Sequence, residues 1–327
     1  MDLSIVTTLY YSSPYLESFH ARARATAERI TPDFEIVFVN DGSPDNSLAI
    51  ALKLQQQDKH IRIVDLSRNF GHHKAMMTGL AHARGELVFL IDSDLEEEPE
   101  LLETFHEKLR ETGADVVFGV QHKRKGGWFE RVSGALFFKA FNALSAYPLP
   151  RNVITARLMT RRYVWSLVRH QERETLAAGL WVITGFDQVA VKVAKSRNRT
   201  STYNLRKKVS HFVNAITSFS SKPLVFIFYL GCFILLLSTI AALDLNIRRL
   251  FFGALLVGWP SLIISVWLLG GLTIFCLGVI GIYLSKIFIE VKQRPYTIVR
   301  EVYEAAETLD LATEQIEQTG RRLHELR

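Results

Sequence analysis

Glu86-Leu87-Val88-Phe89-Leu90-Ile91-Asp92-Ser93-Asp94 is the stretch that decides the fold of this chain. Five apolar residues end abruptly in two carboxylates separated by one residue. Such a run is typical of a strand buried on both faces of a parallel sheet. Asp92 and Asp94 then lie at the carboxyl edge of the sheet, where open α/β folds bind ligands. Two carboxylates at this spacing suit Mg²⁺ or Mn²⁺, although the same residues also fit a plain turn before a helix.

Strand and helix patterns alternate on both sides of this stretch, from residue 1 to about residue 122. The predicted strands are 3–9, 34–39, 61–66, 87–91 and 116–120. The predicted helices are 13–29, 46–57, 71–83 and 99–112. This alternation predicts an α/β domain on a parallel, Rossmann-like sheet, which we place at residues 1–196.

Hydrophobic residues make up 48% of the 327 residues, and the excess is concentrated in two uncharged stretches. These are Leu224–Leu243 and Leu250–Leu284. About twenty apolar residues span the ~30 Å hydrocarbon core of a bilayer. We therefore predict two transmembrane helices within residues 224–288; burial in a protein core is the alternative interpretation.

Basic residues flank both predicted spans, and the formal net charge is +6. Residues 197–223 form a basic juxtamembrane segment before the first span, and further Lys and Arg residues follow the second. The start of the chain lacks the pattern of a signal peptide. Together these features predict a multi-pass protein whose globular domain is cytoplasmic, although Arg248 and Arg249 in the connecting loop count against it. The charge favours anionic lipid over nucleic acid as a partner.

The tail after the second span carries apolar residues at helical spacing. We predict a cytoplasmic helix within residues 289–327 that serves packing or homo-oligomerisation. The apolar positions are Ile298, Val302, Ala305, Leu309 and Ala312. The two cysteines, Cys232 and Cys276, lie inside the predicted spans, so we expect neither a disulfide framework nor a thiolate metal site.

Two further polar segments follow predicted strands. Asn40-Asp41-Gly42-Ser43 allows a tight turn and offers an acceptor for a nucleobase or ribose. Ser67-Arg68-Asn69-Phe70-Gly71 offers an arginine that can reach a phosphate. Each segment alone also fits an ordinary solvated turn.

In this order, the segments resemble the polyprenyl-phosphate glycosyltransferases of family 2, which have the GT-A fold and are related to dolichol-phosphate mannose synthase. The membrane segments extend the resemblance, which covers the chain to about residue 303. Ile216–Leu224 resembles the family's approach to the membrane, and Gly278–Leu284 with Glu290–Pro295 resembles its exit. Within this family the chain resembles the bactoprenol glucosyltransferases in particular.

The resemblance implies roles for the matching residues. Thr8 and Tyr10 would border the base pocket, and Asp41 would bind the base or ribose. Asp92 would lie close to the diphosphate and the metal, and Asp94 would hold the metal ion, Mg²⁺ or Mn²⁺. Three further groups complete the expected site: Glu96 as a metal ligand, Arg68 with Asp92 and Asp94 as catalytic residues, and Arg197, Arg199, Arg206 and Lys207 as ligands of the lipid phosphate.

The chain also departs from the family pattern. An acidic residue expected before Arg157-Leu158-Met159 is replaced by Ile154-Thr155-Ala156, which puts a catalytic carboxylate there in doubt. The basic segment lacks the usual Gly and Lys around Ser201 and Tyr203, and Ala215 replaces a larger residue.

We therefore expect an inverting, metal-dependent transfer of a hexose, glucose from UDP-glucose, to undecaprenyl or another polyprenyl phosphate in the bacterial inner membrane. A phosphate monoester is largely ionised near pH 7, so its attack needs no strong general base. Three alternatives stay open. They are a GDP-mannose-dependent mannosyltransferase, a processive polysaccharide synthase, and a non-catalytic membrane scaffold with a degenerate transferase domain. The synthase lacks support because its Gln-x-x-Arg-Trp motif is missing.

Overall fold

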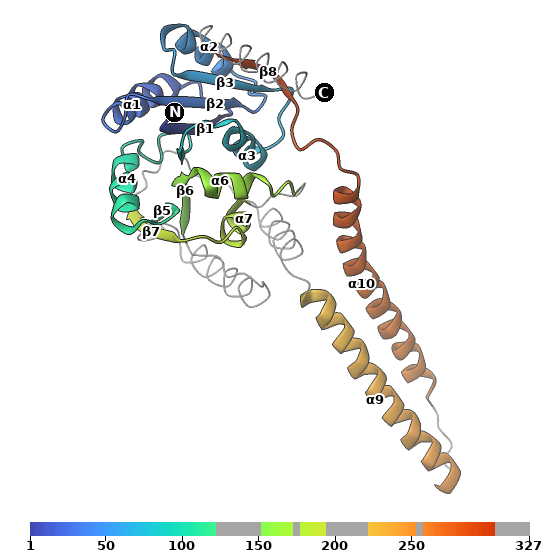
Figure 1. The fold of residues 1–327 in the computed structure, drawn as a ribbon. Helices are drawn as coiled ribbons and strands as arrows, with labels where there is room; N and C mark the ends of the chain where they lie inside the picture. Colours follow the sequence, from blue (N-terminus) through green and yellow to red (C-terminus); the bar gives the residue numbers. More distant parts are fainter. Residues whose placement is uncertain (122–151, 173–176, 194–221, 253–257, 305–327) are drawn as a thin grey trace, which may run out of the picture. The chain divides into compact units, whose positions relative to one another are not determined.

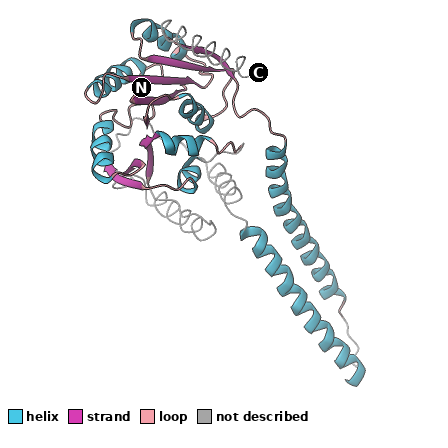
Figure 2. Cartoon of the chain, in the orientation of Figure 1, coloured by secondary structure: helices cyan, strands magenta, loops and turns pink. Residues whose placement is uncertain are grey.

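An eight-stranded sheet, drawn in magenta in Figure 2, forms the centre of the globular part of the chain. The computed structural model describes residues 1–121, 152–172, 177–193, 222–252 and 258–304. The strand order is β7-β5-β6-β4-β1-β2-β3-β8. The strands are β1 (Leu3–Leu9), β2 (Phe34–Asn40), β3 (Ile61–Leu66), β4 (Leu87–Leu90), β5 (Val116–Gln121), β6 (Val153–Thr160), β7 (Gln188–Val193) and β8 (Val299–Tyr303).

The sheet is mixed, which corrects the expectation of a parallel one. Strands β3, β2, β1 and β4 are parallel neighbours, as predicted. Strand β6 lies antiparallel between β4 and β5, and β8 lies antiparallel beside β3. The parallel expectation came from strands joined by helices, whereas β6 and β8 follow segments that do not have this alternation. The ends of the four parallel strands still meet at one edge.

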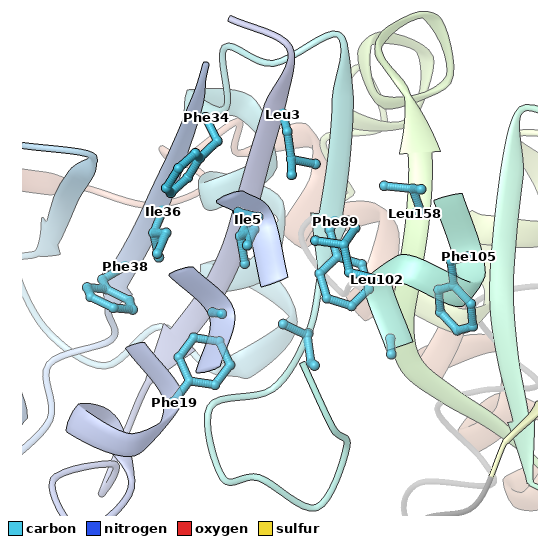
Figure 3. Packing of buried hydrophobic residues seen from close by; sticks show 14 of the residues in the cluster. Leu3, Ile5, Phe19, Phe34, Ile36, Phe38, Phe89, Leu102, Phe105 and Leu158 are labelled. Atoms are coloured by element: carbon cyan, nitrogen blue, oxygen red, sulfur yellow. The ribbon is translucent and has the colours of Figure 1, made fainter. Parts of the chain in front are cut away.

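Helices cover both faces of the sheet (Figure 1). They are α1 (Leu16–Glu28), α2 (Ser47–Gln57), α3 (His72–His82), α4 (Leu101–Thr112), α6 (Arg161–Val168) and α7 (Ala177–Ile183). The side chains of Ile5, Ile36 and Phe89 point to one face and pack with Phe19 of α1 and Phe105 of α4 (Figure 3). The opposite face packs on α3, α6 and α7. Strands β1 and β2 are buried along their whole length, as expected for strands that are covered on both faces.

Two long helices, α9 (Lys222–Phe252) and α10 (Trp259–Val291), form a second unit and contact each other. Ser265–Val291 is the one segment among the described residues that is long and apolar enough to cross a membrane, with 27 residues and a mean hydropathy of 2.2. Its most apolar part is not buried within the protein, which disfavours a core helix. Among the described residues α9 shows an apolar run only over Lys222–Ile234, so the two-span hairpin stays a prediction.

The chain after α10 returns to the sheet, which corrects the prediction of a helix there. Val299–Tyr303 forms strand β8 along the free side of β3. The apolar residues Ile298 and Val302 fit a helical spacing, but strand pairing with β3 satisfies the backbone groups of both segments. Residues 305–327, the rest of the predicted helix, lie outside the described part of the chain.

Candidate functional site

The candidate site lies at the edge where the four parallel strands end. Because β1, β2, β3 and β4 run in the same direction, the loops that follow them meet at this edge. Seven of the residues singled out from the sequence lie here, Thr8 at the end of β1 and six on these loops: Tyr10, Asp41, Arg68, Asp92, Asp94 and Glu96. The four predicted ligands of the lipid phosphate, Arg197, Arg199, Arg206 and Lys207, lie outside the described residues.

Asp41 joins the loop after β2 to the loop after β3. Its carboxylate is 2% exposed and accepts the backbone N–H groups of Phe70 at 2.7 Å and Gly71 at 3.1 Å. Burial raises the pKa of Asp41, and the two N–H groups oppose that rise. Asp41 therefore fixes the position of the 67–71 loop in addition to its expected contact with a nucleotide.

Gly42 lets the backbones of these two loops touch. Its φ of +58° is in the left-handed region that favours glycine. A Cβ atom at this position would lie 2.5 Å from the backbone nitrogen of Asn69 and 2.6 Å from the carbonyl carbon of Arg68. No side chain fits there without displacing backbone.

Asp45 connects the loop after β2 to the loop after β1. It accepts hydrogen bonds from the hydroxyls of Ser43 and Ser47 and from the backbone N–H of Ser13. The Ser43 hydroxyl also accepts the N–H of Tyr11. Burial alone would raise the pKa of Asp45, but these hydrogen bonds outweigh it and hold the pKa well below its usual range. The prediction from sequence missed Asp45, although its place in an Asp-Gly-Ser-Pro-Asp segment is a signal for it.

The turn after β4 is attached to the loop after β1 through Ser93. The buried Ser93 hydroxyl donates to the carbonyl of Thr8 at 3.0 Å and lies 2.9 Å from the Ser12 hydroxyl. Asp94 accepts the N–H of Glu96 on Oδ1 at 3.0 Å. The carboxylates of Asp92 and Asp94 are half-buried at the edge of the sheet, because Ser93 between them points inward and they do not.

His72, at the start of α3, contacts both Thr8 and Asp92. The prediction from sequence did not include this residue. Its Nε2 lies 3.3 Å from Asp92 Oδ1, and its Nδ1 lies 3.1 Å from the Thr8 hydroxyl. An ionised carboxylate only accepts, so Nε2 carries the proton and Nδ1 accepts from Thr8. Partial burial lowers the pKa of His72, and three carboxylates oppose this in part: Asp41, Asp94 and Glu97. His72 is therefore neutral near pH 7 and orients Asp92.

Glu97 supplies a carboxylate beside the segment where the family's acidic residue is missing. It is fully buried and accepts the N–H groups of Thr155 at 3.2 Å and Ala156 at 2.7 Å. A glutamate run before a proline indicates the start of a helix, so this contact could not be predicted from the local pattern. The carboxylate ties the turn after β4 to β6.

Arg157 is a buried cation on β6, opposite Leu90 at the end of β4. Its guanidinium lies over the ring of Trp181, 2.9 Å from the ring centroid, and donates to the carbonyls of Ile154 and Thr155. Burial lowers the pKa of Arg157 to about 9. It stays charged near pH 7, and its positive charge lies next to the site edge.

Arg68 and Tyr10 lie on the surface of the same edge. The Arg68 guanidinium stacks on Phe70 at 4.0 Å from the ring centroid and donates to the carbonyl of Asn69. The ring of Tyr10 packs edge-on against Tyr11, and about half of each side chain is exposed. Both predicted contacts with a nucleotide sugar are accessible from solvent.

The carboxylates of the edge fit a metal ion that is shared with a substrate. Within the described ranges, no three His, Cys, Asp or Glu side chains group closely enough to enclose a metal ion. Mg²⁺ is commonly held by one or two carboxylates and completes its octahedral shell with water and substrate phosphate oxygens. The pair Asp92 and Asp94 suits that arrangement, with Glu96 two residues further along.

Replacing Ser93 by alanine tests the attachment of the turn after β4. The change removes the buried hydroxyl that bonds to the Thr8 carbonyl and the Ser12 hydroxyl, so we expect a loss of about 1 to 2 kcal/mol in the free energy of unfolding. In thermal unfolding of the purified protein, this loss appears as a fall of several degrees in the midpoint temperature. Ser166→Ala is the matched control, because its hydroxyl bonds only to Arg162 O within α6 and its loss is expected within ~0.5 kcal/mol. Equal shifts in both variants would contradict the assignment.

The chain is similar to known proteins over most of its length. Residues 4–168 match the model of glycosyl transferase family 2. A protein of Mycobacterium tuberculosis (strain CDC 1551 / Oshkosh) that carries the name of a glycosyltransferase is 59% identical over 303 residues, which cover 93% of this chain and 89% of the relative. The bactoprenol glucosyl transferase of Shigella phage SfII is 33% identical over 304 residues, 92% of this chain and 98% of the relative. The structure of S. aureus TarS 1-349 in complex with UDP-GlcNAc is 17% identical with a TM-score of 0.44, over 67% of this chain and 66% of that one.

Proposed function

Since the chain belongs to glycosyl transferase family 2, we propose that this glycosyltransferase moves a hexose from a nucleotide sugar to a polyprenyl phosphate. The observation that carries the proposal is the meeting of Asp41, Asp92 and Asp94 at one sheet edge, in a chain that also has an exposed apolar helix. The bactoprenol glucosyl transferase relative, matched over 98% of its length, supports glucose as the sugar and a polyprenyl phosphate as the acceptor.

The apolar helix supports a membrane-embedded acceptor. Ser265–Val291 has 27 residues, and at 1.5 Å per residue it extends about 40 Å, more than the ~30 Å core of a bilayer. We propose that α9 crosses with α10 as a hairpin, so that the sheet domain works at the cytoplasmic face of a bacterial inner membrane. The basic segment, with Arg197, Arg199, Arg206 and Lys207, would then bind the acceptor phosphate near the bilayer surface.

The proposed donor is UDP-glucose, bound across the sheet edge. Asp41 and the 8–11 loop would border the base, and Asp92 and Asp94 would face the diphosphate. A divalent ion, Mg²⁺ or Mn²⁺, would stabilise the negative charge of the leaving diphosphate when bound. Asp94, with Glu96 and Asp92 nearby, would hold it.

The chain's own groups then have defined tasks in the transfer. An oxygen of the acceptor phosphate forms a bond to the anomeric carbon of the sugar, and the bond from that carbon to the diphosphate breaks on the opposite face. The configuration inverts, and the nucleoside diphosphate leaves with the bonding electron pair. The acceptor is already ionised near pH 7, so His72 and Asp92 are needed for orientation and not to remove a proton.

The proposal is tested by supplying the purified protein with undecaprenyl phosphate and labelled UDP-glucose, UDP-GlcNAc or GDP-mannose, with Mg²⁺ and with EDTA. We expect a lipid-linked sugar from UDP-glucose and its loss in EDTA. Formation of lipid-linked mannose from GDP-mannose would show that the donor is GDP-mannose and not UDP-glucose. Release of free sugar without lipid product would contradict the acceptor, and no turnover of any donor would favour the scaffold alternative.

A further inference from the structure

A short segment that follows α10, residues 295–304, holds the loop whose backbone binds Asp41. Residues 295–304 contact the chain both before and after the 67–71 loop. At the start of the loop, the N–H of Ser67 donates to the carbonyl of Ile298 at 2.9 Å, and Arg300 Nη2 donates to the carbonyl of Ser67 at 2.8 Å. The first residue of the loop is therefore bonded to this segment through both of its backbone groups.

The same segment contacts α3 after the loop. The Thr297 and Thr78 hydroxyls lie 2.8 Å apart, and Lys74 lies over the ring of Tyr296 at 5.5 Å from its centroid. The 67–71 loop is thus held at both ends by residues 296–300. Its N–H groups at Phe70 and Gly71 are the ones that Asp41 accepts.

A second connection runs through buried side chains to the turn that contains Asp41. Arg300 Nη1 donates to Asp65 Oδ2 at 3.1 Å, and Asp65 Oδ1 accepts the side-chain amide of Asn40 at 2.7 Å. The side-chain oxygen of Asn40, Oδ1, in turn accepts the N–H of Ser43 at 3.2 Å. Asp65 is 1% exposed, so its charge depends on these two donors for compensation. The amide of Asn40 supplies a donor to Asp65 that an ionised carboxylate at this position could not supply.

We propose that Arg300 is a positioning residue for the nucleotide-sugar site, acting through Asp65 and Asn40 on the Asp41 turn and through Ser67 on the facing loop. It touches neither substrate in this role. The segment that follows the apolar helix α10 is therefore a working part of the donor site. The inference about donor affinity rests on the proposed function, whereas the inference about loop position does not.

Strand β8 offers a matched control at its other end. Because β8 is antiparallel to β3, Arg300 lies at the site edge and Glu304 lies at the opposite edge. Glu304 is 2.7 Å from Arg62 Nε and 3.0 Å from Arg84 Nη2. Arg300→Gln and Glu304→Gln each remove a charge that anchors the same strand, but only the first is next to the donor loops.

The test measures hydrogen exchange without nucleotide and steady-state kinetics with UDP-glucose and undecaprenyl phosphate. For Arg300→Gln we expect faster exchange of the N–H groups of Ser43, Phe70 and Gly71. We also expect the KM for UDP-glucose to rise about tenfold, as for loss of one charged hydrogen bond, with kcat and the KM for the lipid unchanged. Glu304→Gln should change neither quantity. Arg300→Lys should restore wild-type exchange and KM in part. An ammonium group can pair with Asp65, but it lacks the second N–H group with which the guanidinium also reaches the Ser67 carbonyl.

Two results would overturn the proposal. One is wild-type exchange at these three N–H groups in Arg300→Gln. The other is equal changes in exchange and KM in Arg300→Gln and Glu304→Gln, which would show that β8 only stabilises the sheet. Faster exchange in Arg300→Gln, in a protein whose wild type does not use UDP-glucose, would support the positioning role and reject the proposed donor.

Discussion

Asp94→Asn is expected to lower the rate of sugar transfer by about 10³-fold, which corresponds to about 4 kcal/mol of transition-state stabilisation. Asparagine keeps an oxygen that accepts the N–H of Glu96, as Asp94 Oδ1 does at 3.0 Å. The turn after β4 is therefore preserved, and the change removes only the charge expected to hold the divalent ion. Asp94→Ala should lose at least as much activity, because it removes the turn contact as well.

The measurement is transfer of labelled glucose to undecaprenyl phosphate at saturating Mg²⁺ by protein extracted from membranes in normal amounts. Glu98→Gln is the matched control, since it removes a charge from an exposed residue of the same loop. It should retain nearly full activity. More than a tenth of wild-type activity in Asp94→Asn would refute the metal assignment.

Gly42→Ala is expected to cost about 2 to 5 kcal/mol of stability, combining strain at positive φ with overlap of the backbone. The new Cβ would lie 2.5 Å from the Asn69 nitrogen, so the loops after β2 and β3 would have to separate. Separation pulls the Asp41 carboxylate away from the N–H groups of Phe70 and Gly71. Donor binding should therefore fall together with the thermal midpoint.

Gly113→Ala separates strain from overlap. Gly113 ends α4 at a φ of +66°, much like Gly42 at +58°, but nothing lies within 4 Å of the atom that alanine would add. Its cost should be about 1 kcal/mol, with an unchanged KM for the donor. Thermal unfolding and donor kinetics of both variants decide the matter. Equal losses in the two variants would show that the contact with Asn69 has no role.

The strands and helices before residue 122 were predictable because their patterns are local. Strands β1 and β3 begin and end at the predicted residues, since apolar runs bounded by polar turns fix both ends. Helix α1 begins at Leu16 and not at Ser13, because Ser12, Ser13 and their neighbours bond to the loop after β2 instead. Strand β8 was predicted as a helix, because its partner β3 is over 200 residues away in sequence and leaves no local pattern.

The site shows the same division between local and distant signals. Asp41, Asp92 and Asp94 were found because each stands directly after an apolar strand, and such positions meet at one edge of a parallel sheet. Their roles in transfer stay predictions. His72, Glu97 and Arg157 were missed, because their contacts with Asp92, with β6 and with Trp181 come from other elements. A histidine at a helix start or an arginine in an apolar strand gives no sign in the sequence of what it will touch.

The pairing of β8 with β3 also sets an order of events during synthesis. Arg300 and Asp65 are separated by 235 residues, and α9 and α10 both lie between them. Strand β3 is therefore an open edge, prone to pairing with other chains, until the ribosome has made both apolar helices. The donor loops reach their final positions only after the segment that follows α10 has emerged. A nascent chain would thus complete its proposed nucleotide site only when the helices proposed to anchor it in the membrane have already been made.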